Sequence, residues 1–480
     1  MNSDIQSRYE NALDALCPQN NDKAEAPDAV KSIVSALGAI GGVDECSVVL
    51  AITAVMNGWA PMTAGPRDGY GVGISRELNL LLDPGTCMGI DDFHTALLKP
   101  VWRREAVLHK RARAADAKKV AGCLEDLGRY EKLFRPDSEH RLSGHVDCLP
   151  QRYVYAYGYE LLRRPVFYMR DPDDRTLERG LTESLTRAVL VDLFGSSMFE
   201  ELASKAGRTA VSKAEAIVRL LHGGHRCGPG LKHEHSEVKV ERCRGALVGT
   251  TDNDSLASIL TRRCEPGFSL LKYCIVHPAT ARRHAIKSAA IDDALERWDR
   301  AVADRITADV IGFGNGDTLL ETVAWPRFVS YRRDLQGLAD HAPAGEVAFL
   351  RPLWALPARI LCGLRNLSRQ ETVEDFKATA HYAEYVARRV AAAHVRTYAA
   401  AHGATIAMLR DDDNPEARML EKLRRRGPMQ FRDLLRMYSR QVKRIHQPVL
   451  DRLMESGRVF LNDEGLLEAD AETEEARKAG

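Results

Sequence analysis

The sequence lacks an excess of charge of either sign. Its 68 lysine and arginine residues nearly balance 67 aspartate and glutamate residues, which leaves a formal net charge of +1. This balance excludes a uniformly basic protein that coats nucleic acid, although it allows a local basic face. Aromatic residues are scarce at 6%, and 45% of the 480 residues are hydrophobic. This composition predicts a soluble globular protein of two or three domains.

The sequence also has little that would belong to a membrane or an oxidising compartment. The most apolar run, Cys46 to Met56, is too short to cross a bilayer, and no signal peptide opens the chain. The 10 cysteines have no framework spacing, which is typical of reduced thiols in a cytosol. We therefore expect a cytoplasmic protein without a membrane partner.

A complete nucleotide-binding motif is missing as well. Residues 78–100 predict a leucine-rich strand, a turn at Pro84 and Gly85, and a helix from near Phe93 that Asp91 or Asp92 can cap. Strand, glycine turn and helix are the parts with which P-loop proteins hold a nucleoside triphosphate. In the motif G-x4-G-K-[ST], the lysine reaches the outer phosphates and the hydroxyl binds magnesium.

The degenerate P-loop carries other side chains at the decisive positions. It comprises Gly85, Gly89, Ile90 and Asp91, so isoleucine replaces the lysine and aspartate replaces the hydroxyl residue. Asp91 and Asp92 would cap the helix amides and repel a triphosphate. One such like-charge pair at 4 Å costs about 1 kcal/mol in water and about 4 kcal/mol near a protein surface. We predict that this turn does not bind ATP, and we assign the protein no cofactor.

Strands alternate with helices over residues 78–278, which predicts an α/β domain with a mainly parallel sheet. Apolar runs predict the later strands at residues 164–169, 188–192, 237–251 and 268–276. Asp192 ends one of them, in the position of a Walker-B aspartate, although an acid there is commonly a helix cap. We expect a flexible leader at residues 1–27, an α/β core at 28–285, a helical region packed on it at 286–410 and a winged helix at 416–470.

Two further groups of residues are weaker candidates. The helical region after the degenerate P-loop is basic between Arg103 and Lys119, and we favour a solvated face over a nucleic-acid contact. A histidine and cysteine cluster follows, from which four residues could bind zinc if the segment folds as a hairpin. Those four are Cys227, His233, His235 and Cys243. Their spacing matches no compact zinc pattern, so a polar surface hairpin without metal is favoured.

The C-terminal segment has a readable pattern. After a polar linker at residues 411–415, three short helices precede two short strands around the turn sequence Asn462-Asp463-Glu464-Gly465. This order predicts a winged helix-turn-helix, whose third helix usually enters the major groove of DNA. From Arg418 to Gln447 there are ten basic and two acidic residues, a net charge of +8.

This basic excess predicts nucleic-acid binding, with DNA as the partner. The candidate contacts are Arg424, Arg425, Arg426, Arg440, Gln441, Lys443 and Arg444. Their side chains can reach phosphates or base edges. A winged helix used for protein contact is the alternative, and Pro448 would bend the third helix.

Several stretches resemble an uncharacterised helicase- and primase-associated family of phage, plasmid and mobile-element proteins with a RecA-like ATPase core. The resemblance spans residues 29–403 and the tail. It rests on LNLLLDPGTCMGIDD, LLKPVWRREAVL, RPVFYMRDPDDRTLERGL, AVLVDLFGSSMFEEL, ERCRGALVGTTDNDSLASIL, EPGFSLLKYCIVHP and YAEYVARRVAAAHVRTYA. It implies a RecA-like fold, but four catalytic positions depart from the family. They are Ile90 for the lysine, Asp91 for the serine, Leu193 for the Walker-B glutamate and Leu271 for an arginine.

These departures favour a pseudo-ATPase that binds or scaffolds DNA in replication or its regulation, with a homo-oligomer or a replication protein as possible partner. One alternative is an active NTPase or helicase with an unconventional site that uses Lys99 or Lys272. Another is a zinc-dependent enzyme built on His233, His235 and Cys243.

Overall fold

The computed structural model describes two compact units, Met1–Ala399 and Ala400–Gly480. Within them it describes residues 11–16, 24–58, 78–85, 87–108, 110–111, 114, 168–172, 177, 188–196, 198–199, 217, 244–261, 271–282, 288–307, 319–342, 347–365, 367, 372–412, 419–420, 423, 427–430, 434, 450–451, 453–457, 459–462 and 465–469. The histidine and cysteine cluster and the predicted DNA contacts lie outside these residues, as do residues 1–10 and 17–23 of the predicted leader. Residues 11–16 of the leader are helical, and Leu16 and Ala24 are buried in the core.

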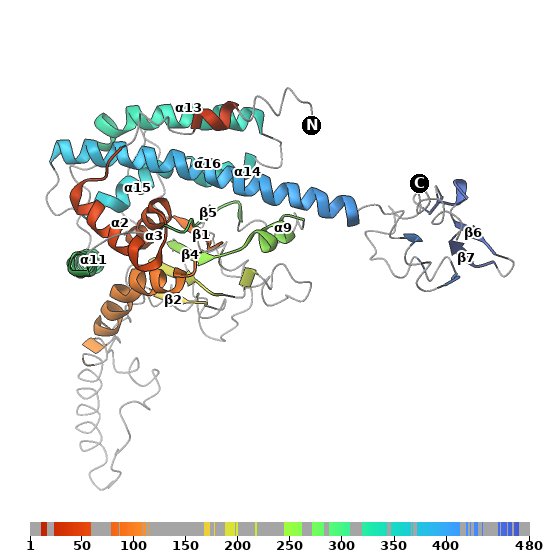
Figure 1. Cartoon of the computed structure of the whole chain (residues 1–480), viewed down its shortest axis with the longest axis horizontal. Helices are drawn as coiled ribbons and strands as arrows, with labels where there is room; N and C mark the ends of the chain where they lie inside the picture. Colours follow the sequence, from red (N-terminus) through yellow and green to blue (C-terminus); the bar gives the residue numbers. More distant parts are fainter. Residues whose placement is uncertain are drawn as a thin grey trace, which may run out of the picture. The chain divides into compact units, whose positions relative to one another are not determined.

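A five-stranded sheet forms the centre of the first unit (Figure 1). Its strands are β1 (Asn79–Asp83), β2 (Tyr168–Arg170), β3 (Ala188–Leu193), β4 (Arg244–Thr250) and β5 (Ile275–Pro278). They lie in the order β2-β3-β4-β1-β5, and every neighbouring pair is parallel. The predicted α/β class with a parallel sheet is thus confirmed. Helix α9 (Asn253–Thr261) follows β4.

The last predicted strand, residues 268–276, is wrong at its start. Leu271 is helical, a turn follows it, and β5 begins only at Ile275. The carbonyl of Leu271 accepts hydrogen bonds from the Tyr398 hydroxyl at 2.9 Å and from the Cys274 amide at 3.3 Å. These bonds close a turn where the apolar run alone predicts extended chain.

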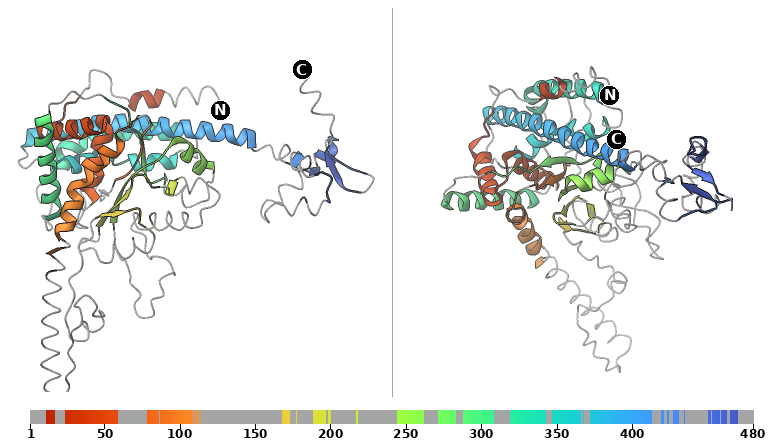
Figure 2. Two further views of the ribbon diagram at one scale, coloured as in Figure 1. Left: turned by 60° about the horizontal axis from the view of Figure 1, so that its bottom comes forward. Right: turned by 45° about the vertical axis from the view of Figure 1, so that its right-hand side comes forward.

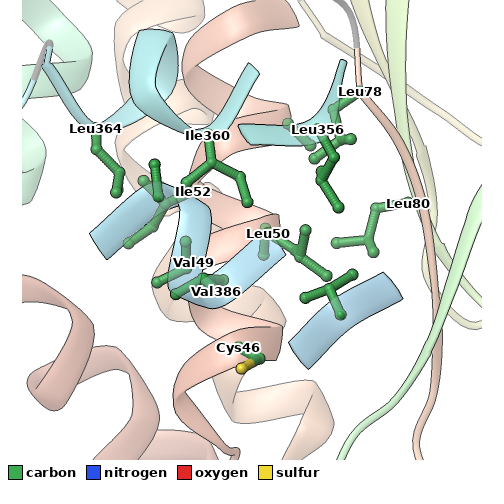
Figure 3. Packing of buried hydrophobic residues seen from close by; sticks show 14 of the residues in the cluster. Cys46, Val49, Leu50, Ile52, Leu78, Leu80, Leu356, Ile360, Leu364 and Val386 are labelled. Atoms are coloured by element: carbon green, nitrogen blue, oxygen red, sulfur yellow. The ribbon is translucent and has the colours of Figure 1, made fainter. Parts of the chain in front are cut away.

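Helix α3 (Glu45–Gly58) lies between the sheet and a layer of helices. Figure 3 shows Leu50 and Ile52 of α3 among Leu80 of β1, Ile360 of α15 and Val386 of α16. Every residue of α3 from Cys46 to Gly58 is buried, as expected for a helix that is apolar on all sides. The apolar run of the sequence is therefore the central core helix.

The remaining helices pack on the same core, with α2 (Asp28–Gly41) preceding α3 (Figure 2). After β5 come α11 (Ser288–Thr307), η3 (Leu320–Ala324), α13 (Trp325–His341), α14 (Val347–Leu350), the 3-10 turn η4 (Arg351–Leu353), α15 (Leu356–Arg365) and α16 (Val373–Asp412). Leu80, Trp298 and Val386 belong to one buried cluster, so sheet and helices share a single core. Helix α16 continues through Asp412, which corrects the linker predicted to begin at residue 411.

One helical segment, Val347–Arg365, is long and apolar enough to cross a membrane by length and composition. Its most apolar window is 67% buried inside the protein. The turn η4 divides it into α14 and α15, and Leu353, Leu356 and Leu361 are members of the core. We assign the segment to the core of the first unit.

The second unit is built around a small apolar cluster. Strands β6 (Val459–Leu461) and β7 (Leu467–Ala469) form an antiparallel hairpin, and Met429 pairs with Leu467 on the other side of β7. The cluster comprises Met419, Leu420, Leu423, Leu434, Leu450, Leu453, Val459 and Leu467. The hairpin predicted around residues 462–465 is confirmed.

Candidate functional site

The carboxyl ends of the parallel strands mark where a ligand would be expected. The connection that leaves β1 runs past β4 and β3 to reach β2 at one edge of the sheet. The connection that leaves β4 runs the opposite way, past β1, to reach β5 at the other edge. The two connections therefore diverge between the neighbouring strands β1 and β4. Asp83 ends β1 here, Thr251 and Asp252 follow β4, and Asp192 lies near the end of neighbouring β3.

Asp192 is the central residue of a buried polar cluster. Its side chain is fully buried, and its Oδ2 lies 2.9 Å from Nε2 of His94. The Tyr168 hydroxyl also donates to Oδ2, and the amide of Phe194 donates to Oδ1 at 2.9 Å. Because a carboxylate only accepts hydrogen bonds, Nε2 of His94 is the donor in its pair.

Aromatic rings enclose this cluster. The rings of His94 and Phe194 stack with centroids 4.3 Å apart, and Trp102 meets both His94 and Tyr168 edge-on at 5.9 Å. Burial and the neighbouring Asp192 raise the pKa of Tyr168 well above its ordinary value, which keeps its hydroxyl proton in place as a donor. Asp192 thus links β2, β3 and the helix over residues 90–108.

The turn after β1 contains two hydrogen bonds of its own. Oδ1 of Asp83 accepts the Gly85 amide at 3.1 Å, and the carbonyl of Pro84 accepts the Cys87 amide at 2.8 Å. Gly85 has a positive φ of 48°, a conformation that glycine adopts without strain. The pKa of Asp83 lies above its ordinary value, mainly because the carboxyl is partly buried. The hydrogen bond from the Gly85 amide opposes this rise, and the charge of Asp252 adds to it.

The helix after this turn begins at residue 90, so Asp91 and Asp92 lie inside its first turn and are exposed. The expectation that one of them is the cap before a helix starting near Phe93 is therefore wrong. Gly89 lies against the end of α2, where a Cβ on Gly89 would stand 2.5 Å from the carbonyl oxygen of Gly41. Only glycine permits this approach, which places protein backbone beside the helix N-terminus.

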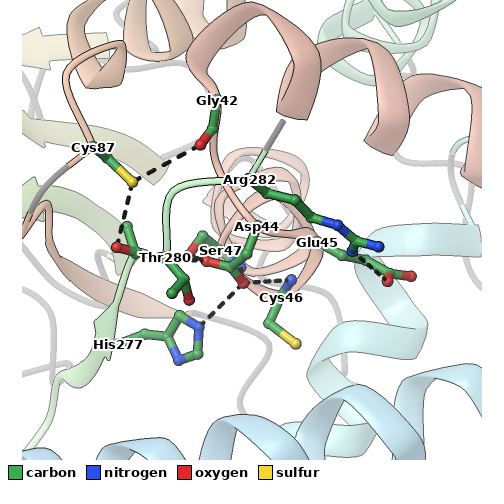
Figure 4. Close-up of polar contacts among 10 residues, drawn as sticks. Gly42, Asp44, Glu45, Cys46, Ser47, Cys87, His277, Thr280 and Arg282 are labelled. Atoms are coloured by element: carbon green, nitrogen blue, oxygen red, sulfur yellow. Dashed lines mark hydrogen bonds and ion pairs between the residues drawn. The ribbon is translucent and has the colours of Figure 1, made fainter. Parts of the chain in front are cut away.

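Hydrogen bonds connect the α2–α3 loop to Cys87 and to the segment after β5 (Figure 4). The Cys87 thiol donates weakly to the carbonyls of Ala279 and Gly42, at 3.4 and 3.9 Å. The amide of Thr280 donates to Oδ2 of Asp44 at 2.9 Å, and the amide of Arg282 donates to the carbonyl of Gly42 at 2.8 Å. The segment after β5 thereby ties this loop to the end of the sheet.

Asp44 is the N-cap of α3, with its Oδ1 accepting the amides of Cys46 and Ser47. Nε2 of His277 lies 3.6 Å from the same oxygen. Burial raises the pKa of Asp44, but the hydrogen bonds and charge of His277 together with Ser47 and Thr280 outweigh it and hold that pKa well below the ordinary range. This cluster stabilises the loop as a capped helix start.

The other predicted residues are placed only in part. Lys99 is exposed on the helix over residues 90–108, and Lys272 is half-buried in the turn before β5. Leu193 and Leu271 are buried. Arg424–Arg426, Arg440, Gln441, Lys443 and Arg444 lie outside the described residues, as do Cys227, His233, His235 and Cys243. Among the residues that are described, no group of three or more acidic, histidine or cysteine side chains is placed to hold a metal.

Sequence reasoning missed His94 and Tyr168. The signal for His94 was present, because it is a polar residue on the helix face that carries Phe93, Leu97 and Val101. Tyr168 gives no comparable signal, since a tyrosine in a strand is ordinary. A comparison with protein-family models, curated proteins and solved structures finds no significant match.

Proposed function

We propose that this chain is a non-hydrolysing relative of RecA-like P-loop proteins, which binds DNA through its C-terminal unit. It would act as a scaffold in the replication of a phage or mobile element, or in its regulation. The observation that carries the proposal is the buried Asp192, held by His94, Tyr168 and the Phe194 amide. A Walker-B aspartate must instead reach the magnesium of a bound nucleotide.

The strand order supports the RecA-like interpretation. In RecA-like P-loop proteins, the strand before the phosphate loop lies between the fourth and fifth strands, as β1 does here. A nucleotide would then lie beyond the ends of β1 and β4. Asp83 lies at that point, and the exposed Asp91 and Asp92 follow in the first turn of the next helix. Three carboxylates without a compensating lysine disfavour a triphosphate.

Direct protein contacts take over the connections that a bound nucleotide would make. The His94–Asp192 pair joins the helix after the degenerate P-loop to β3, where a magnesium ion would otherwise join them. The Gly41 backbone approaches Gly89, at the end of the turn that would surround phosphates. Both features favour a core whose shape is stable without a ligand.

The described part of the tail supports a winged helix. Helical residues at 419, 420 and 423 precede the Met429 bridge, further helical residues lie at Leu434 and at 453–455, and the β6–β7 hairpin comes last. Met429 pairs with Leu467 through two backbone hydrogen bonds of 3.1 and 2.9 Å, which form a single β-bridge beside the β6–β7 hairpin. With the net charge of +8 over residues 418–447, this arrangement favours duplex DNA as the partner.

Titration of the full chain with labelled ATP and magnesium tests the central claim. We expect no saturable binding up to millimolar ATP and no phosphate release. Binding with turnover that Asp192→Asn removes, in a variant that circular dichroism shows to be folded, would instead establish the active NTPase. We also propose a cytoplasmic location and assembly as a homo-oligomer or with a replication protein.

A further inference from the structure

Trp354 is an unusual residue of the first unit because it is a tryptophan held at the surface. It is 40% exposed, whereas neighbouring Pro352 and Leu353 are buried. Its amide donates to the carbonyl of Arg351 at 3.2 Å, which closes the 3-10 turn η4. Side chains three residues apart in such a turn project from the same side, so exposed Arg351 and Trp354 lie beside each other.

This turn is held rigidly from two helices. The hydroxyl of Tyr331 donates to the carbonyl of Leu353 at 3.0 Å, and Nε of Arg332 donates to that of Trp354 at 3.4 Å. Nη1 of Arg359 on α15 donates to the carbonyl of Pro352 at 2.8 Å. Three successive carbonyls are therefore bound by side chains, which fixes the position of the exposed ring.

Stacking fixes the orientation of the ring as well. The guanidinium carbon of Arg332 lies 5.0 Å from the ring centroid of Trp354 and 4.3 Å from that of Trp325. Trp325 and Arg332 are two turns apart on α13 and share one side of that helix. Such cation–π contacts order the ring and leave its exposed surface available to another planar group.

The charge around Trp354 is positive. Arg332 on α13 and Arg359 on α15 donate to carbonyls of the turn, and Arg351 belongs to the turn itself. Within the described part of the chain, Arg351 is exposed and forms no ion pair. A rigid exposed ring among arginines matches the chemistry of a nucleobase and its phosphates.

We propose that this Trp354 platform, comprising Trp325, Arg332, Arg351 and Trp354, binds single-stranded nucleic acid. An unpaired base stacks on Trp354, and Arg351 contacts a flanking phosphate. The platform belongs to the first unit and is independent of duplex binding by the tail. A stacked base in a duplex has no free face to offer, so the platform selects single strands.

The test uses the full chain and a fluorescein-labelled 20-nucleotide oligo(dT), with a mixed-sequence 20-base-pair duplex as the second probe. Trp354→Ala is expected to weaken oligo(dT) binding roughly tenfold or more, because base–aromatic stacking is lost. Trp354→Phe should retain most of the affinity. Arg351→Glu should weaken binding at low salt and have less effect at high salt. Duplex binding should stay unchanged in all three variants.

The matched control is Arg300→Glu, which reverses an exposed arginine on α11 and should leave oligo(dT) binding unchanged. Oligo(dT) should also quench part of the wild-type tryptophan fluorescence, and Trp354→Phe should remove that part while binding persists. Equal oligo(dT) affinity of Trp354→Ala and wild type would overturn the proposal, as would an equal loss in Trp354→Phe. A change in sedimentation without a change in oligo(dT) binding would identify a protein contact instead.

Discussion

Nε2 of His94 lies 2.9 Å from Oδ2 of Asp192, and both side chains are buried. His94 comes from the helix after the degenerate P-loop and Asp192 from β3, so the pair joins two elements across the edge where a ligand would be expected. The pair makes Asp192 part of the folded core.

Asp192→Ala should lower the free energy of unfolding by about 3 to 5 kcal/mol, because His94, Tyr168 and the Phe194 amide lose their common acceptor inside the protein. Urea unfolding followed by circular dichroism measures the change. The control is Asp293→Ala, at an exposed position of α11, which should change stability by less than about 0.5 kcal/mol. Equal stability of the two variants would show that Asp192 is available for another role.

Gly89→Ala should destabilise the protein by about 1 to 3 kcal/mol, because the added Cβ would stand 2.5 Å from the backbone oxygen of Gly41. Gly337→Ala on α13 is the matched control, since its Cβ meets nothing within 4 Å. That change should stabilise the helix by about 0.5 to 1 kcal/mol. Thermal unfolding should therefore separate the two glycine substitutions by sign, and a neutral Gly89→Ala would contradict the close approach.

Stability should fall as the pH drops from about 6.5 to 4, because of His394. Its Nδ1 accepts the Val276 amide and its Nε2 donates to the Phe349 carbonyl, each at 2.9 Å. Burial lowers the pKa of His394 to about 4, against opposing backbone hydrogen bonds. The unfolded chain, with a histidine pKa near 6.5, takes up the proton first, so the contribution is complete above about pH 6.5 and is lost towards pH 4.

A lowering of this size corresponds to roughly 3 kcal/mol of stability. His394→Gln removes the titrating group, so the difference in unfolding free energy between wild type and variant should shrink between pH 7 and pH 4. Urea titrations at four pH values measure it. A difference that stays constant over this range would contradict the linkage.

Changing Arg440, Lys443 and Arg444 together to glutamate should abolish measurable duplex binding by the full chain. If each of the three contacts a phosphate, the slope of log affinity against log salt should decrease by about 3. The control reverses three exposed basic residues of the first unit, Arg103, Arg300 and Lys377. Their surface ion pairs contribute little to stability. Unchanged, salt-insensitive duplex binding by the tail variant would remove the DNA assignment.

The local elements of the first unit were predictable because their periodicity is local. The leucines of β1, the apolar residues of α3 and the acid that ends AVLVD lie where the pattern places them. The start of β5 was not predictable, since a hydrogen bond from Tyr398, more than a hundred residues later, fixes Leu271 in a turn. The end of α16 was not predictable either, because a run of aspartates indicates a linker from residue 411, whereas the helix continues through Asp412.

The sequence by itself determined that Ile90 and Asp91 stand where a complete P-loop motif would have a lysine and a hydroxyl residue, because side-chain chemistry at fixed positions needs no fold to be known. It also determined the α/β class and the basic charge of the tail. Only the tertiary structure decided how the site is filled. His94 and Tyr168 reach Asp192 from separate elements. The Gly41 backbone contacts Gly89, although the two residues lie far apart in the sequence and no periodic pattern relates them. Contacts of this kind depend on how the sheet brings distant segments together, which no local pattern encodes.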